Sequence, residues 1–167
     1  KILTNKEDLY ILNMQLFEKH PKISKETKYH QDNAYFNLHP CEAFTAWIPT
    51  DTVTKKNSTL YYYAGSQKED LLPHDPHGNL GASMCVSKKI IDKIKQRYKK
   101  HYIEIKKGDC VIHSPLVVHG SKKNRGQVDR GAFNMSIKSK KAKLDIIGFS
   151  NYEKKLKSFL KAKKKKK

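Results

Sequence analysis

The stretch PLVVHGSKKNRGQVDRGAFNMSIK, residues 115–138, contributes most to the fold prediction. It opens with a short apolar run at 116–119 and closes with alternating apolar and polar residues at 132–138. Such alternation is typical of a strand with one buried face. The stretch therefore predicts two strands joined by a polar loop, with His119 at the end of the first strand and Arg130 just before the second.

The rest of the chain predicts further short strands and two helices. Apolar, β-branched and aromatic segments predict strands at 9–17, 29–32, 43–48, 58–63, 102–105 and 110–113. Apolar residues that recur every three or four positions predict helices at 87–98 and 151–162. About eight short strands with peripheral helices predict a mainly β fold, a double-stranded β-helix (jelly roll) of the cupin-like kind.

Length and composition suit one domain. The chain has 167 residues, of which 37% are hydrophobic, including nine Tyr, six Phe and one Trp, so it can bury a single core. It has no apolar run near the roughly 18 residues that a membrane-spanning helix needs. The three cysteines include no close pair, which favours a reducing, cytoplasmic setting over a disulfide framework.

The net charge is +19, and much of it lies at the C-terminus. The segment 154–167 holds nine lysines and no acid. We expect residues 1–150 to form the β domain and residues 151–167 to form a lysine-rich helix or tail. The tail reads as solvated low-complexity sequence, and it could also make nonspecific contacts with nucleic acid or anionic lipid. A basic nucleic-acid-binding or nucleic-acid-modifying β domain is therefore an alternative for the whole chain.

Three residues form a candidate metal set. On a strand, side chains two positions apart face the same side, so His30 and Asp32 can offer a nitrogen and an oxygen to one ion while Gln31 points away. His119 supplies a second imidazole. Two histidines and one carboxylate are the facial triad of non-haem Fe(II) oxygenases. Arg130 is one of three arginines beside 32 lysines, and its planar fork suits a small carboxylate.

These motifs resemble the phytanoyl-CoA dioxygenase family of Fe(II)- and 2-oxoglutarate-dependent oxygenases. The likeness runs from about residue 9 to residue 139, and the eleven-residue step from His119 to Arg130 is its most specific feature. The matching pieces are His30-Gln31-Asp32, the segment AWIP at 46–49, NSTL at 57–60 leading to Gly65-Ser66, KGD at 107–109, HSP at 113–115, and the block from His119 to Arg130.

The resemblance implies a function and a role for each matching residue. It implies a hydroxylase of a small-molecule or lipid-like substrate that uses Fe(II), O2 and the cosubstrate 2-oxoglutarate and releases succinate and CO2. It assigns iron to His30, Asp32 and His119, which would form the catalytic metal centre. The implied 2-oxoglutarate site consists of Arg130, Ser121 and Trp47. The implied substrate mouth consists of Gln31, Asn33 and Tyr35.

Some positions depart from the family pattern. Gln67 stands where the family often has a histidine, and His74 is a possible substitute. The segment 74–77, His-Asp-Pro-His, is expected to be a solvated loop rather than a second metal cluster. His113 precedes Pro115 and is expected to pack structurally. Family members carry a longer helical region before the first barrel strand, so the chain is expected to be a fragment.

Overall fold

The structure is a computed structural model that describes residues 8–79 and 82–165. Its strands are β1 (Leu9–Lys19), β2 (Thr27–His30), β3 (Leu38–His39), β4 (Ala43–Pro49), β5 (Leu60–Tyr63), β6 (His74–Asn79), β7 (Ala82–Val86), β8 (Lys100–Tyr102), β9 (Val111–His113), β10 (His119–Ser121), β11 (Arg130–Ser139) and β12 (Lys143–Leu144). The helices are α1 (Asn33–Phe36), the 3-10 helix η1 (Ser66–Glu69), α2 (Lys88–Arg97) and α3 (Ile146–Lys164).

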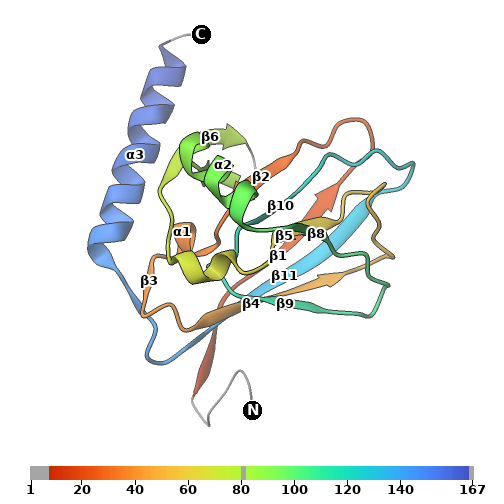
Figure 1. The fold of residues 1–167 in the computed structure, drawn as a ribbon, viewed down its shortest axis with the longest axis horizontal. Helices are drawn as coiled ribbons and strands as arrows, with labels where there is room; N and C mark the ends of the chain where they lie inside the picture. Colours follow the sequence, from red (N-terminus) through yellow and green to blue (C-terminus); the bar gives the residue numbers. More distant parts are fainter. Residues whose placement is uncertain (1–7, 80–81, 166–167) are drawn as a thin grey trace.

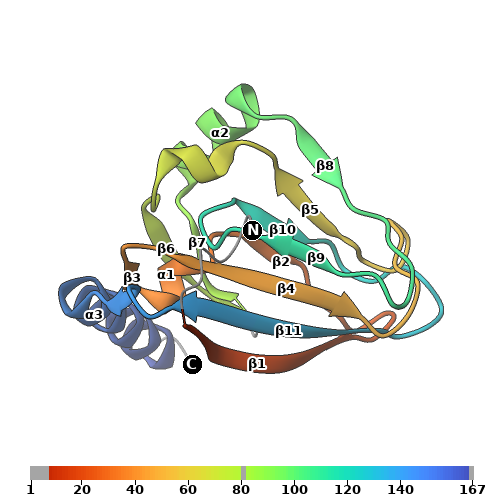
Figure 2. The same cartoon turned by 90° about the horizontal axis from the view of Figure 1, so that it is seen from below.

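Two antiparallel four-stranded sheets form the body of the molecule (Figure 1). The first sheet has the order β1-β11-β4-β9 and the second has the order β2-β10-β5-β8. Figure 2 shows them as two layers, with α2 beyond the second sheet and α3 at one end of the molecule. This is the predicted double-stranded β-helix, mainly β with helices at its periphery.

Strand β5 is buried on both faces, and this divides the core in two. Tyr62 faces inward and packs in a cluster between the sheets with Trp47, Leu60 and Ala132. Side chains alternate along a strand, so Tyr61 and Tyr63 face outward. They pack against α2 in a second cluster. The members of this cluster are Tyr61, Tyr63, Val86, Ile91, Ile94 and Val118. The continuous apolar run of β5 is thus explained by burial on both sides.

The first sheet has an apolar outer face and a more polar inner face. Met14 pairs with Met135, and Leu16 pairs with Phe133. Met14 is 65% exposed, so this row of side chains faces outward. Ser136, the next residue along β11, faces the other way and pairs with Thr45 on β4, and both side chains are fully buried. The inner face can therefore present polar groups to the space between the two sheets.

Several predicted boundaries were wrong, and the reasons are local. Residues 115–117 form a turn, in which the Val117 N–H donates to Ser114 O, so the strand begins only at His119. Asp32 lies beyond β2 at the start of α1, because the Tyr35 N–H donates to its carbonyl. The expected loop at 74–77 belongs to the hairpin of β6 and β7.

Further corrections concern the ends of elements. The predicted strand at 102–105 is replaced by β8 at Lys100–Tyr102. Helix α3 begins at Ile146, earlier than predicted, because the Asp145 side chain accepts a hydrogen bond from the Gly148 N–H and caps the first turn. The helix contacts α1 and β6. The division of the chain at residue 150 stays a prediction. No helix in the described ranges is long and apolar enough to cross a membrane.

Candidate metal and cosubstrate site

The structure brings the three predicted metal ligands together. Strand β10 pairs with β2, which places His119 opposite His30. The Nε2 atom of each histidine lies 3.5 Å from Asp32 Oδ1. One ligand atom from each of the three side chains can be chosen so that all lie within 4.8 Å of one another. A single ion could therefore contact all three residues.

Backbone carbonyls orient both imidazoles. His30 Nδ1 lies 2.8 Å from Lys28 O, and His119 Nδ1 lies 3.0 Å from Val117 O. A carbonyl only accepts, so each Nδ1 carries a hydrogen, and in the neutral imidazole each Nε2 then has a lone pair for a metal. Burial, with His30 nearby, lowers the pKa of His119 to about 3. His119 is therefore neutral at physiological pH, as metal ligation requires.

The Asp32 carboxylate is held on one side. Its Oδ2 accepts hydrogen bonds from Thr45 Oγ1 at 2.8 Å and from His113 Nε2 at 3.2 Å. Burial alone would raise the pKa of Asp32, but the nearby histidines, His119 first among them, hold it well below its ordinary value. The carboxylate is therefore ionised, and Oδ1 is the oxygen that lies near His30 and His119.

Three residues around His30, Asp32 and His119 were not predicted from the sequence. Thr45 and His113 pair across β4 and β9, so both face the interior. Tyr62 O–H lies 3.1 Å from His113 Nδ1, and the Tyr62 ring stacks on the His119 ring. The sequence contained one signal for Thr45, its alternation within the strand predicted at 43–48. The contact of His113 with Asp32 joins residues 81 positions apart, and no local pattern reports it.

Arg130 is a buried cation with an unused donor. It is 2% exposed, and its Nε atom has no hydrogen-bond partner among the described residues. Its guanidinium lies 5.4 Å from the Trp47 ring centre. Burial lowers the pKa of Arg130 to about 10, so it is charged at neutral pH. Asp129, the acid that could have neutralised it, instead lies 2.9 Å from His20 Nδ1.

An unpaired buried charge is costly, so this guanidinium fits an anionic ligand. Lys19 adds a second basic group, because it pairs with Arg130 across β1 and β11. Its Nζ donates to Lys25 O and Lys122 O at 2.9 Å. Ser121 is buried two residues beyond His119. Lys19 was missed because nothing in its local pattern separates it from the other lysines.

The residues predicted at the substrate mouth lie in three environments. Gln31 is fully buried; its Nε2 donates to two backbone carbonyls and its Oε1 accepts from the Leu72 N–H. Asn33 bonds both backbone groups of Leu38. Neither amide is free for a substrate, so both support the fold. Tyr35 lies against His30 with ring centres 5.8 Å apart, while its hydroxyl donates to Met84 O.

His74 does not form a second metal cluster. Its Nε2 accepts the Gln31 N–H at 3.1 Å and its Nδ1 donates to Leu72 O at 2.7 Å, so both nitrogens are occupied. Burial lowers its pKa to about 4. His74 is therefore a buried structural residue rather than part of a solvated loop. Among the described residues, only His30, Asp32 and His119 form a group of three that could hold a metal.

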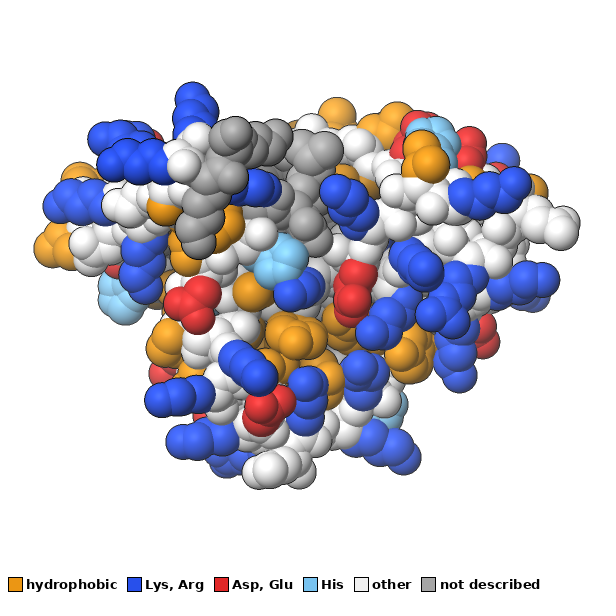
Figure 3. Space-filling model, turned by 90° about the horizontal axis from the view of Figure 1, so that it is seen from above, with side chains coloured by type: hydrophobic (Ala, Val, Ile, Leu, Met, Phe, Trp, Pro, Cys, Tyr) orange, Lys and Arg blue, Asp and Glu red, His pale blue; other side chains and the backbone are white. Residues whose placement is uncertain are grey.

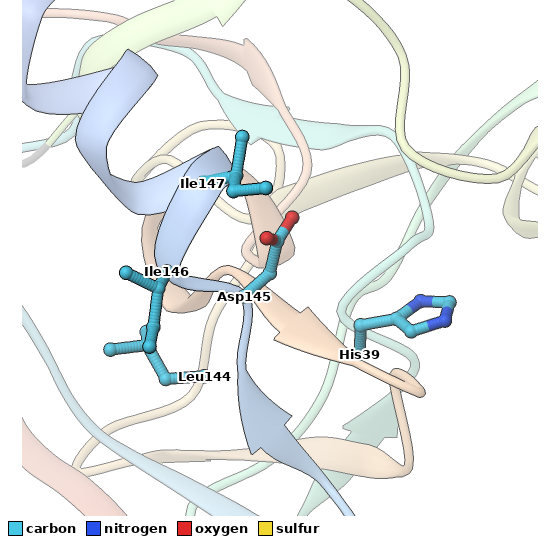
Figure 4. A pocket seen from close by; sticks show the side chains of 5 residues that line it. All are labelled: His39, Leu144, Asp145, Ile146 and Ile147. Carbon is cyan, nitrogen blue, oxygen red and sulfur yellow. The ribbon is translucent and has the colours of Figure 1, made fainter.

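Two surface features lie outside this site. An open depression of about 620 Å3 at the start of α3 contains none of the candidate ligands (Figure 4). It is lined by His39, Leu144, Asp145, Ile146 and Ile147. Lys and Arg side chains are spread over the face seen in Figure 3. Neither feature points to a second centre of chemistry.

The fold and the site together define a class: jelly-roll proteins whose two sheets enclose a two-histidine, one-carboxylate set. The sequence profile of the phytanoyl-CoA dioxygenase (PhyH) family matches residues 6–132. The chain belongs to this family. It is 30% identical over 131 residues to the peroxisomal phytanoyl-CoA dioxygenase of Bos taurus, covering 76% of this chain and 39% of the bovine protein.

One more curated protein and two solved structures are similar to this chain. A probable phytanoyl-CoA dioxygenase of Caenorhabditis elegans is 28% identical over 153 residues, covering 89% of this chain and 47% of that protein. EvdO2 from Micromonospora carbonacea var. aurantiaca, solved with 2-oxoglutarate, has a TM-score of 0.66 at 19% identity, covering 83% of this chain and 54% of that one. The carbocyclase SnoK has a TM-score of 0.66 at 20% identity, covering 81% of this chain and 52% of that one. This chain thus spans less than half the length of the bovine and nematode relatives.

Proposed function

We propose that this chain is the core of an Fe(II)- and 2-oxoglutarate-dependent dioxygenase that hydroxylates a small-molecule or lipid-like substrate. Succinate and CO2 would be the coproducts. The observation that carries the proposal is the pairing of two features across one interior. A His-Asp-His set offers free lone pairs, and a buried arginine has no anionic partner among the described residues.

The donor set fits Fe(II). Imidazole nitrogen and carboxylate oxygen are ligands that non-haem iron accepts, and three of them leave positions open. His30, Asp32 and His119 would hold the ion. When bound, Fe(II) with 2-oxoglutarate would supply the O2-activating chemistry of hydroxylation. The protein's own contribution is to orient both imidazoles through their Nδ1 atoms and to keep the carboxylate ionised.

The cosubstrate would be oriented by its far end. Arg130 can grip a carboxylate through parallel N–H···O bonds, and the hydroxyl of Ser121 would add a hydrogen bond. Trp47 is buried with its ring centre 5.4 Å from the guanidinium, so it would line the same part of the cosubstrate site. Fixing the distal carboxylate in this way removes orientational freedom before the reaction, which lowers its entropic barrier.

The substrate class and the cellular location that we propose are broad. The names of the curated relatives favour an acyl-CoA thioester, whereas the SnoK title describes a carbocyclase from nogalamycin biosynthesis. We therefore propose the substrate class only as small or lipid-like. The free cysteines favour an intracellular setting. We propose the cytoplasm for this chain, whereas the bovine relative is named peroxisomal.

Turnover without a known substrate tests this proposal. The purified chain with Fe(II), O2 and 2-oxoglutarate should form succinate slowly in an uncoupled reaction, and His119→Ala should abolish it. Tyr63→Phe is a matched control, because Tyr63 is buried on the outward face of β5. No succinate above the His119→Ala background would contradict the proposal. Strongly salt-dependent DNA affinity in the same preparation would then favour the nucleic-acid alternative.

A further inference from the structure

The two oxygens of the Asp32 carboxylate lie in different environments. Oδ1 lies 3.5 Å from both ligand histidines. Oδ2 accepts from Thr45 Oγ1 and His113 Nε2. His113 is buried, so its bond to Oδ2 is shielded from water. The structure thus separates one oxygen for the ligand cluster from one oxygen held by the protein.

The direction of the hydrogen bonds at His113 follows from its two partners, Asp32 and Tyr62. An ionised carboxylate only accepts, so His113 Nε2 carries the hydrogen. In a neutral imidazole Nδ1 is then an acceptor, and Tyr62 O–H lies 3.1 Å from it. Burial raises the pKa of Tyr62, which keeps its hydroxyl protonated and able to donate. The donors therefore run in one direction, from Tyr62 through His113 to Asp32.

We propose that Tyr62 and His113 are positioning residues that make Asp32 present a single oxygen to the metal. The inference rests on the proposed function. A carboxylate free to rotate can bind a metal through both oxygens, and the second oxygen would take a coordination position that the cosubstrate or O2 needs. Hydrogen bonds to Oδ2 prevent this, because they hold that oxygen toward the protein.

Thr45 on β4 donates to the same oxygen, so the two donors to Oδ2 come from two different strands. Thr45 Oγ1 lies 2.8 Å from Oδ2 and is fully buried. His113 comes from β9, the neighbouring strand, directly opposite Thr45. Two donors from paired strands fix the plane of the carboxylate as well as its direction. Loss of His113 leaves one donor, about which the group can rotate.

Cobalt(II) binding to the metal-free full chain tests the inference without any turnover. We expect His113→Ala to raise the Co(II) dissociation constant by roughly 10- to 100-fold, the usual effect of removing a residue that supports a metal ligand. His113→Gln keeps an N–H donor and should restore most of the affinity. Tyr62→Phe should also weaken binding while its ring still stacks on His119. Tyr63→Phe, the matched control on the same strand, should bind as the unaltered protein does.

The possible results distinguish a wrong positioning role from a wrong metal site. Equal Co(II) affinity in Tyr62→Phe, His113→Ala and the unaltered protein, with binding lost in His30→Ala, overturns the positioning role and leaves the metal site intact. No Co(II) binding by the unaltered protein overturns both. Should His113→Ala fail to fold by circular dichroism, Tyr62→Phe decides alone, because it removes one oxygen atom. Failure of His113→Gln to recover affinity also counts against the role, since the donor is then not what matters.

Discussion

Lys19 and Arg130 lie opposite each other in the ladder of β1 and β11, and both side chains are buried. Burial, followed by the nearby guanidinium, lowers the pKa of Lys19 to about 7. The Arg130 charge disfavours the charged form of Lys19, and Glu26 offsets part of this effect. An anionic ligand beside Arg130 would favour the charged forms of both groups.

The first prediction concerns stability and pH. The folded pKa of Lys19 is below its ordinary value of 10.5, so the unfolded chain binds a proton that the folded chain lacks between about pH 7 and 10.5. Stability should therefore rise with pH in this window, by at most about 1.4 kcal/mol per pH unit from this group. Lys19→Met should flatten the rise in urea unfolding measured from pH 7 to 9. An unchanged slope would contradict the lowered pKa of Lys19 in the folded protein.

Arg130 should show opposite effects on stability and binding. Arg130→Met removes a buried charge with an unpartnered donor, so the ligand-free protein should unfold at higher urea concentration. The same variant should bind 2-oxoglutarate about 10- to 100-fold more weakly, because charge-assisted hydrogen bonds are lost. Arg130→Lys should recover little, since an ammonium lacks the planar fork. Calorimetric titration with 2-oxoglutarate checks this, and full affinity in Arg130→Met would refute the assignment.

His74 should make the protein acid-sensitive. Its folded pKa of about 4 lies below the ordinary value of 6.5, so its neutral form is bound into the fold. The stability from this group is fully present above pH 6.5 and is lost as the pH falls toward 4, by up to about 3 kcal/mol. His74→Gln cannot titrate and should lose less stability over this range. Parallel losses in the two proteins would show that His74 is not the sensor.

The cluster beneath α2 should affect stability alone. Ile91 is fully buried against Tyr61 and Tyr63 on the outward face of β5. Ile91→Ala should lower the free energy of unfolding by about 2–5 kcal/mol, the usual range for a buried cavity. At 10 °C, where the variant remains folded, Co(II) affinity should match that of the unaltered protein. A large loss of affinity in a folded Ile91→Ala would mean that the two clusters are coupled.

Strands were predictable where one face alone is buried. The alternation at 132–138 correctly located the centre of β11, because its inner residues meet the core and its outer residues meet solvent. The strand predicted at 116–119 overlaps the turn at 115–117, since a short apolar run has the same composition in either structure. The β6–β7 hairpin was missed because Pro76 and Gly78 are signals that usually indicate a loop.

Some residues of the candidate site were predictable from the sequence and others were not. The residues found from motifs, His30, Asp32 and His119, do lie together, although Asp32 follows the end of the strand rather than continuing it. Lys19 and His113 could not be found, because their roles arise from pairing between strands distant in sequence. Register of this kind depends on the whole fold and leaves no local pattern.

Anaerobic titration with Fe(II) and 2-oxoglutarate, followed by visible absorbance, tests the central claim most directly. A visible charge-transfer band should appear only when the ion and the cosubstrate are both present, and it should saturate at one equivalent of iron. His30→Ala, Asp32→Ala and His119→Ala should each abolish the band, and Arg130→Met should shift its formation to higher 2-oxoglutarate concentrations. Absence of the band in the unaltered protein, or its persistence in His119→Ala, would contradict the site.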